Sequence, residues 1–321
     1  MVSIIIPVYN GERYIDRCLG AILPALRETE VIAVNDGSED ASLEKLRQYA
    51  QTYPNLLVID KRQNEGLPQA KKTGLTVAKG DYVAFLDVDD WAEPELYAAM
   101  EGKARESRAD LVFCDFKEEL PDRTKEKRSR LRRGTSLPIS GKEALRYVHK
   151  RSAVFQYPWN KLYRAELLRR IEFPTGNFVG EDYYVTLRFL LMAERVDYLP
   201  FAGYHYVTVP GSMSRGGYGP NTALAYERYR EDLHLITQVY PHERAATCDY
   251  LITEYLAFVI AMGRNDTYDQ AMIREIKQFV REHLLHYLCS DSVSLKMKGS
   301  ALTLLLGEKF LVRLYRMIKQ S

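Results

Sequence analysis

The sequence has few cysteines, and their spacing excludes two classes of small structural site. They are Cys18, Cys114, Cys248 and Cys289, and no two of them form a C-x-x-C pair. A zinc knuckle or a disulfide framework needs cysteines in closely spaced, recurring pairs. The cysteine content therefore predicts neither kind of site and fits a reducing cytoplasm.

The sequence also lacks an excess of one charge and a long apolar run. Its 45 Lys and Arg residues nearly balance its 43 Asp and Glu residues, which leaves a formal net charge of +2. This balance gives no overall argument for nucleic-acid binding. No apolar run reaches transmembrane length, and Met1 leads directly into a strand pattern, so we expect no signal peptide. We predict a cytoplasmic protein whose membrane contact, if any, is peripheral.

Two common nucleotide-binding motifs are missing as well. A Rossmann site needs G-x-G-x-x-G after the first strand, and a P-loop needs G-x-x-x-x-G-K-[ST]. The sequence contains neither pattern. A nucleotide site in this chain would be of another kind.

Apolar strands and amphipathic helices alternate along the first half of the chain. Strands are expected at residues 2–9, 30–35, 56–60, 81–86 and 110–116, and helices at residues 11–26, 41–53, 67–78 and 93–107. This alternation predicts an α/β fold with a mostly parallel central sheet flanked by helices. In such sheets, ligands bind outside the carboxyl ends of the strands.

The second half begins with strand patterns and ends in helices. Strands are expected at residues 196–200 and 204–207, and helices at residues 223–239, 243–263, 270–288 and 295–318. We therefore expect a sheet domain over residues 1–219 and a helical region over residues 220–321.

Polar residues follow the first two strands at their carboxyl ends. Pro7, Tyr9 and Glu12 stand at the end of the first strand, and Asp36 at the end of the second. Asp36 can accept a hydrogen bond from the imide of a base, and Tyr9 can cover the base with its ring. The alternative is a strand-to-helix turn in which Asp36 bonds its own backbone.

Three carboxylates follow the strand at residues 81–86. Asp87, Asp89 and Asp90 lie within four positions, where like charges repel unless a cation lies among them. Mn²⁺ or Mg²⁺ prefers such oxygen ligands, with phosphate oxygens completing the coordination. The alternative is an Asp-rich turn that caps a helix beginning near Glu93.

Four segments in this order resemble the inverting family 2 glycosyltransferases with the GT-A fold, of the bacterial surface-polysaccharide type. They are residues 3–10, 34–38, 64–67 and 86–91. The resemblance implies a nucleotide-sugar donor, usually a UDP-sugar, with Pro7, Tyr9 and Asp36 holding the base and Glu12 close by. It also implies that residues 87–90 hold the ribose and the metal-bound diphosphate. We take Asp89 as the preferred metal ligand, followed by Asp87 and Asp90.

A lysine occupies a position where these transferases commonly carry arginine. Residues 70–72 are Ala-Lys-Lys, whereas family members commonly have Ala-Arg-Asn. Lys71 keeps a cation near the donor but lacks the bidentate fork of arginine. Alternatively, Lys71 and Lys72 lie on the solvated face of a helix.

Two later segments supply the candidate catalytic groups. Inverting transfer needs a carboxylate to take the proton of the acceptor hydroxyl, and the resemblance assigns this role to Asp182 of the Gly-Glu-Asp motif, with Glu181 orienting the substrate or the base. The alternative is a helix that begins with acids because of its dipole. The segment at residues 210–215 resembles the mobile loop of the family, in which Arg215 would neutralise the departing diphosphate.

Several further features carry two interpretations each. The basic stretch at residues 117–133 is either solvated surface or a flap for an anionic acceptor. Trp159 either forms the floor of a sugar pocket or packs in the core; it lies in a segment that interrupts two helical patterns. The neighbouring Asn160 and Lys161 can reach hydroxyls of the donor or acceptor. His205 is either a metal ligand or a structural residue. The last helix either lies on an anionic membrane, packs on its neighbours or forms a homodimer face.

The resemblance, together with the carboxylate motifs, implies a metal-dependent inverting glycosyltransferase. It would move a sugar from a nucleotide-sugar donor to a hydroxyl of a glycan or lipid-linked glycan in cell-surface polysaccharide synthesis. The alternative is a catalytically inactive subunit that binds sugar nucleotides or acts as a scaffold. A nucleotidyltransferase would show a Gly-rich, Lys-containing first loop, and a receiver protein would leave the motif at residues 180–182 unexplained.

Overall fold

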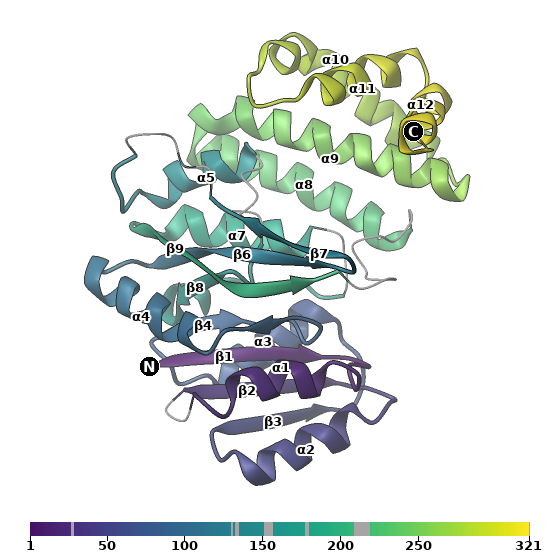
Figure 1. Ribbon diagram of the computed structural model, residues 1–321. Helices are drawn as coiled ribbons and strands as arrows, with labels where there is room; N and C mark the ends of the chain where they lie inside the picture. The colour runs from purple at the N-terminus through teal and green to yellow at the C-terminus, as the bar shows by residue number, and fades with distance from the viewer. Residues whose placement is uncertain are drawn as a thin grey trace. The chain divides into compact units, whose positions relative to one another are not determined.

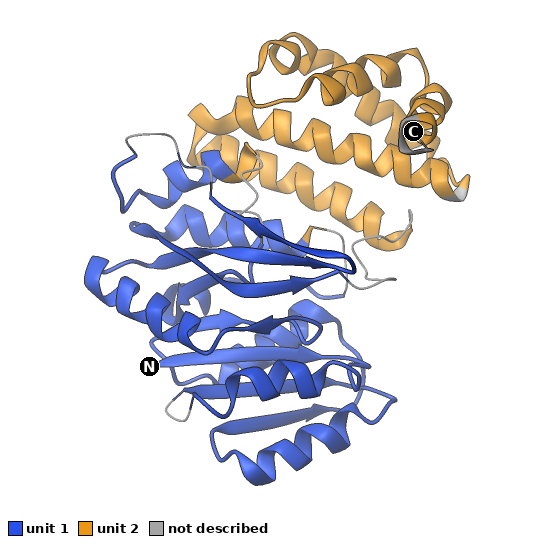
Figure 2. Ribbon diagram, viewed as in Figure 1, with its two compact units in different colours: residues 1–147, 152–177, 181–210 blue, residues 148–151, 178–180, 211–321 orange. Residues whose placement is uncertain are grey.

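The computed structural model describes residues 1–26, 29–129, 131, 135–150, 157–176, 180–208 and 219–320. The chain divides into two compact units (Figure 2). Unit 1 comprises residues 1–147, 152–177 and 181–210, and unit 2 comprises residues 148–151, 178–180 and 211–321. The predicted domain boundary at residues 219 and 220 stays a prediction, because compactness does not show that either part folds alone.

Unit 1 is built on one nine-stranded sheet (Figure 1). The strand order is β3-β2-β1-β4-β8-β6-β9-β5, and β7 pairs with β6 outside this path. The strands are β1 (Val2–Val8), β2 (Glu30–Asp36), β3 (Leu56–Lys61), β4 (Tyr82–Phe85), β5 (Trp91–Ala92), β6 (Leu111–Leu120), β7 (Arg123–Lys127), β8 (Lys161–Arg164) and β9 (Val196–Val207). The first four strands pair in parallel, and β8 joins β4 and β6 antiparallel to both.

Helices cover both faces of the parallel half of the sheet (Figure 1). The helices of this part of the chain are α1 (Ile15–Ile22), α2 (Ser42–Thr52), α3 (Leu67–Val77), α4 (Glu95–Ser107), α5 (Gly141–His149), α6 (Ala165–Leu168) and α7 (Glu181–Met192). Ile4 and Ile6 of β1 share a core with α1 and α4, whereas Ile5 faces α3. A Cβ on Gly74 of α3 would lie 2.5 Å from the Ile5 Cγ2 atom, so glycine allows this close packing. The predicted α/β class is confirmed.

Several local predictions were incomplete where strand pairing decides the structure. The basic stretch after Phe116 is exposed along β7, as the solvated alternative predicted, but it forms a β-hairpin that sequence reasoning missed, because β6 continues to Leu120 and pairs with β7. The segment around Trp159 leads into β8 and does not merely interrupt two helices. The strands expected at residues 196–200 and 204–207 form one continuous strand, β9, which is held along its length by β6 with a shift in register.

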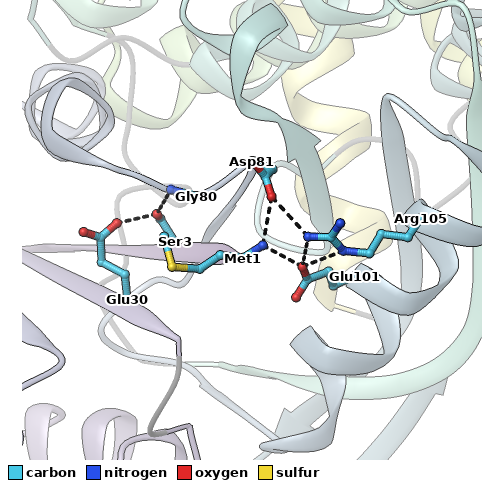
Figure 3. A network of polar contacts seen from close by, with 7 residues as sticks. All are labelled: Met1, Ser3, Glu30, Gly80, Asp81, Glu101 and Arg105. Atoms are coloured by element: carbon cyan, nitrogen blue, oxygen red, sulfur yellow. Dashed lines mark hydrogen bonds and ion pairs between the residues drawn. The ribbon is translucent and has the colours of Figure 1, made fainter.

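Ion pairs mark the amino-terminal ends of the central strands (Figure 3). The Met1 amino group lies 3.0 Å from the Asp81 carboxylate and 2.7 Å from that of Glu101. Arg105 of α4 contacts the same two carboxylates at 3.1 and 2.8 Å. Exposed pairs of this kind contribute little to stability. They lie at the end of β1 opposite to its carboxyl end, where the predicted donor residues stand.

Unit 2 consists mainly of helices (Figure 1). They are α8 (Pro220–Val239), the 3₁₀ turn η2 (Pro241–Glu243), α9 (Arg244–Asn265), α10 (Gln270–Cys289), α11 (Leu295–Leu306) and α12 (Glu308–Gln320). The last predicted helix is in fact two, because the chain leaves helical geometry at Gly307. Among the described residues, one segment, Pro241–Arg264, is long and apolar enough to cross a membrane by length and composition, with a mean hydropathy of 1.3. Of its most apolar stretch, 67% is buried, as in the core helix of a bundle.

Candidate functional site

The end of β1 presents one buried and one exposed residue of the predicted base site. Pro7 is buried within β1 opposite Val34 of β2, while Tyr9, just beyond the strand, is 48% exposed. An exposed aromatic ring beside a buried strand end can cover a flat base. The prediction for Tyr9 is therefore compatible with its position.

Asp36, at the end of β2, is buried and held by three donors. Its Oδ1 accepts a hydrogen bond from Lys61 Nζ at 2.5 Å and from the Glu65 amide at 3.2 Å, and its Oδ2 accepts one from the Gly66 amide at 2.8 Å. The donors are the last residue of β3 and the loop before α3, so the alternative of a self-bonded Asp turn was wrong. Sequence reasoning missed Lys61, although the parallel register places it opposite Asp36.

Glycine lets the loop after Asp36 pass close to the loop before α3. Gly37 has a φ of +68°, and a Cβ there would lie 2.6 Å from the backbone carbon of Gln63 and 2.7 Å from the amide nitrogen of Asn64. Residues other than glycine are strained in both respects. This close approach lets the backbone at residues 65 and 66 bind Asp36.

Glu12 supports the same edge of the sheet from the loop before α1. Its carboxylate accepts a hydrogen bond from the Ala41 amide at 2.9 Å, near the start of α2, and its carbonyl accepts one from Lys45 at 2.9 Å. Glu12 was predicted to contact the nucleotide-sugar donor, and one of its carboxylate oxygens is already engaged in joining two loops.

Asp90 points into the protein from the turn that follows β4. Its Oδ2 accepts a hydrogen bond from the Tyr204 hydroxyl at 2.7 Å, and its Oδ1 accepts one from the Val207 amide at 2.7 Å. Tyr204, which sequence reasoning missed, also accepts a bond from the Asp87 amide at 3.3 Å. The helix-capping alternative was wrong, because α4 begins after Pro94 without a side-chain cap.

Asp87 and Asp89 are only partly buried and have the chemistry of cation ligands. Burial raises the pKa of Asp87 to about 7 against the opposing charge of Lys71, and the charge of Asp89 adds to the rise. Burial also raises the pKa of Asp89. A divalent cation would relieve this repulsion between carboxylates. In the part of the chain that the structure describes, no three His, Cys, Asp or Glu groups could hold a metal by themselves, so substrate oxygens would have to complete the coordination.

Lys71 of α3 is buried against the start of α7. Its Nζ atom is 3.1 Å from Glu181 and 3.7 Å from Asp182, and it lies 5.6 Å from the centre of the Phe85 ring. Burial opposes its charge, but the charges of Glu181 and Asp182 outweigh this effect and raise the pKa of Lys71. A solvated position was therefore the wrong alternative for Lys71, whereas Lys72 is exposed.

The two acids of the Gly-Glu-Asp motif have different surroundings. Glu181 is nearly buried, and burial raises its pKa although Lys71 opposes the rise. The Asp182 side chain is 39% exposed and stands at the amino-terminal end of α7. A cavity of about 10 Å³, room for about one water molecule, is lined by both acids, Lys71 and Phe85. Glu181 is thus a buried partner of Lys71, and Asp182 is the more accessible carboxylate.

Three other predicted residues are part of the core. Trp159 is 4% exposed and stacks on Tyr204 with ring centres 4.3 Å apart, so it does not floor a pocket. Asn160 and Lys161 are fully buried, and the Asn160 amide donates to the Cys114 carbonyl at 2.7 Å. The prediction that they reach substrate hydroxyls was wrong for this arrangement.

His205 has a structural environment. Its ring stacks on Trp91 with centres 3.5 Å apart, and its two nitrogens lie 2.8 Å from Glu119 and 3.2 Å from Glu93. These contacts, and not a metal cluster among the described residues, account for its position.

The hairpin of β6 and β7 balances much of its own positive charge. Lys127 pairs with Glu118 at 3.0 Å, and Arg128 with Glu126 at 2.7 Å. This pairing reduces its capacity to act as a basic flap. Arg215, the predicted diphosphate ligand, lies outside the described residues.

The chain resembles known proteins in sequence and in fold. The profile of glycosyl transferase family 2 matches residues 3–172. The chain is 33% identical over 227 residues to glycosyltransferase GlyA of Streptococcus pneumoniae, which covers 67% of this chain and 31% of that protein. It is also 33% identical over 224 residues to the uncharacterized glycosyltransferase EpsJ of Bacillus subtilis, covering 68% of this chain and 64% of EpsJ. The chain thus spans between about a third and two thirds of the length of these relatives.

The fold has solved counterparts. The crystal structure of S. aureus TarS 1-349 in complex with UDP-GlcNAc aligns with a TM-score of 0.66 over 98% of this chain and 91% of that chain, at 21% sequence identity. At this identity the similarity concerns the fold, and it agrees with the predicted GT-A architecture, a curled mixed sheet flanked by helices and followed by a helical region. Because the family profile matches more than half of the sequence, the chain belongs to glycosyl transferase family 2.

Proposed function

We propose that this protein transfers a sugar from a nucleotide-sugar donor to a hydroxyl of a glycan or lipid-linked glycan, with inversion at the anomeric carbon. The observation that carries the proposal is the meeting of Asp87, Lys71, Glu181 and Asp182, from three distant segments, near the carboxyl end of β4 in a member of this family. The acceptor would belong to the synthesis of a cell-surface polysaccharide.

A UDP-sugar is the donor that we favour. The exposed ring of Tyr9 and the buried Pro7 and Asp36 stand at neighbouring strand ends, where a base can lie against a ring and meet a carboxylate. Asp36 already accepts three hydrogen bonds, so its part would be to hold the loop that surrounds the base and to accept one further bond at most. TarS, which shares the fold, was crystallised with UDP-GlcNAc.

Asp182 is the proposed general base. Its carboxylate is 39% exposed and stands at the amino-terminal end of α7, where an acceptor hydroxyl can reach it. It would accept the proton of the acceptor hydroxyl as that oxygen forms its bond to the anomeric carbon. The bond from this carbon to the diphosphate breaks on the opposite face, and the nucleoside diphosphate leaves. Lys71 and Glu181, which are more buried than Asp182, would fix its position from the protein interior.

Asp87 and Asp89 would hold Mn²⁺ or Mg²⁺, since their carboxylates repel each other and are incompletely shielded. When bound, the ion would neutralise charge on the leaving diphosphate. Asp90, whose two oxygens are bonded to Tyr204 and Val207, would shape the turn that carries these ligands. Arg215 stays a proposed second cation for the diphosphate.

Nucleotide binding tests the donor site. Calorimetric titration with UDP, GDP and CDP, with and without Mn²⁺, should show binding of UDP that depends on the ion. Asp89→Asn should abolish it, whereas Asp122→Asn, the same change at an exposed residue in the turn between β6 and β7, should bind UDP like the wild type. Absence of nucleotide binding under every condition would refute the proposed donor site.

Sugar transfer tests the catalytic assignment separately. Asp182→Asn should keep UDP binding and lose release of UDP from a UDP-sugar in the presence of acceptor, because the amide cannot take the proton. Equal transfer by Asp182→Asn and the wild type would exclude this base. Nucleotide binding without transfer to any glycan acceptor would favour the scaffold alternative.

A further inference from the structure

The last two helices of unit 2 expose large apolar side chains that a soluble bundle would normally bury. On α11, Leu295 is 85% exposed and Leu306 is 79% exposed, and Leu302 is exposed between them. Their spacing of seven and four residues places all three on one side of the helix. This side of α11 is therefore an apolar strip open to its surroundings.

The exposed side of α12 combines apolar and cationic side chains. Phe310 and Met317 are 51% and 59% exposed, and Lys309 and Arg313 are exposed beside them. These positions follow the one-, four- and eight-residue spacing of a single helix face. The α12 face thus has the composition of helices that lie in the interface of a membrane.

Both strips point away from the core of unit 2. Leu304 of α11 and Leu311 of α12 are buried on the other sides of their helices. A Cβ on Gly263 of α9 would lie 2.3 Å from Val312 Cγ2, so α12 is tightly packed on α9 through Val312, which is buried like its neighbour Leu311. The exposed residues therefore take no part in the packing of α12 on α9.

The charge of this segment indicates what covers it. Leu295–Gln320 contains six Lys and Arg residues and one acid, Glu308. Glu308 pairs with Lys277 of α10 at 2.7 Å and so does not neutralise the exposed cations. A second copy of the same surface would bring like charges together. A partner with anionic groups at its surface and an apolar layer beneath them would match both the exposed cations and the exposed apolar side chains.

We propose that the exposed strip of α11 and the exposed strip of α12, together called the α11–α12 surface, bind anionic lipid bilayers; their residues are Leu295, Leu302, Leu306, Lys309, Phe310, Arg313 and Met317. The apolar side chains enter the boundary between headgroups and acyl chains, and the cations lie at the level of the lipid phosphates. This inference does not depend on the proposed transferase activity, because binding to vesicles can be measured without donor or acceptor.

Co-sedimentation of the full 321-residue chain with vesicles tests the proposal. The protein should sediment with equimolar phosphatidylcholine and phosphatidylglycerol at 0.1 M NaCl, and only weakly with phosphatidylcholine alone or at 0.5 M NaCl. Because each cation near an anionic surface raises partitioning by about fivefold, the Lys309→Glu and Arg313→Glu double variant should lose at least about 25-fold in partitioning. The Leu306→Ser and Phe310→Ser double variant should also lose most binding.

A matched control separates this surface from the basic hairpin. Arg123→Glu and Lys125→Glu together make the same change of net charge on exposed residues of β7, and this variant should bind vesicles like the wild type. Circular dichroism of each variant should match that of the wild type, since all the changed side chains are exposed.

Three outcomes would overturn the proposal. The first is wild-type protein that stays in solution with anionic vesicles at low salt. The second is a hairpin variant that loses as much binding as the α12 variant. The third is a wild-type dimer in sedimentation velocity that the Leu306→Ser and Phe310→Ser changes convert to a monomer, which would assign the surface to a second copy.

Discussion

The buried cation Lys71 should stabilise unit 1 and position Glu181 and Asp182, the proposed catalytic acids, and its removal tests the candidate site most directly. The Lys71→Met change keeps the length and apolar stem of the side chain but deletes the charge that lies 3.1 Å from Glu181 and 3.7 Å from Asp182. Glu181 would then be left buried without its cation. Its pKa, already raised by burial, would rise further and the group would become protonated.

The expected loss of stability follows from this uncompensated charge. Removing one partner of a buried ion pair costs about 3–5 kcal/mol. We expect about 3 kcal/mol, since protonation of Glu181 limits the penalty and Asp182 keeps access to water. Lys72→Met is the matched control, because Lys72 is exposed on the same helix, and it should change the free energy of unfolding by less than about 0.5 kcal/mol.

Tryptophan fluorescence during urea denaturation isolates this effect, because Trp91 and Trp159 are the two tryptophans of the chain and both lie in unit 1. The Lys71→Met and Glu181→Gln double variant should recover at least about 1 kcal/mol relative to additive losses, since neither charge then remains unpaired. Equal midpoints for Lys71→Met and Lys72→Met would refute the reasoning. Weaker UDP binding without any loss of stability would instead support the original prediction that Lys71 contacts the donor.

Three further predictions concern other parts of the fold. Gly37→Ala should lower the free energy of unfolding by about 1–3 kcal/mol in the same assay, because its φ is +68° and a Cβ there would lie 2.6 Å from the backbone carbon of Gln63. Gly102→Ala, in open space on α4, should be neutral or stabilising. Burial lowers the pKa of Lys161 to about 7, so between pH 7 and the ordinary pKa of lysine the folded state binds fewer protons than the unfolded state. The free energy of unfolding of the wild type should therefore rise with pH across this window. This rise should be absent in Lys161→Met. Gly263→Val should displace α12 from α9 and lower the thermal midpoint measured by circular dichroism, since even a Cβ would lie 2.3 Å from Val312, and an unchanged midpoint would contradict this packing.

Local patterns were sufficient to predict the parallel half of the sheet. The apolar runs at residues 2–9, 30–35 and 56–60 coincide with β1, β2 and β3 to within one residue at each end. For β1 and β2 the reason is burial on both faces, which requires continuous apolar strands, whereas β3 is an edge strand and is only partly buried. The helix before β2 is shorter than predicted: α1 begins only at Ile15, since residues 11–14 form a turn that Glu12 joins to α2. Local periodicity predicts an element better than it predicts its ends.

Partners that are distant in sequence were beyond local patterns. Nothing in the spacing of Lys71 and Glu181, 110 positions apart, predicts that they form a buried pair. The same holds for Tyr204 and Asp90, whose bond turns one of three adjacent carboxylates into the core. Pairing of this kind depends on which segments the sheet brings together and on the cost of leaving a buried charge alone.

The sequence by itself determined the fold class, the family resemblance and the strand ends at which polar residues gather, because these depend on apolar periodicity and on short contiguous motifs. Only the tertiary structure distinguished the roles of similar residues: Lys71 is buried while Lys72 is exposed, and Asp90 is bonded inward while Asp87 and Asp89 stay partly accessible. The physical reason is that desolvation and hydrogen bonding act on each side chain through its neighbours in space, and β8, β9 and α7 supply those neighbours from the distant second half of the chain.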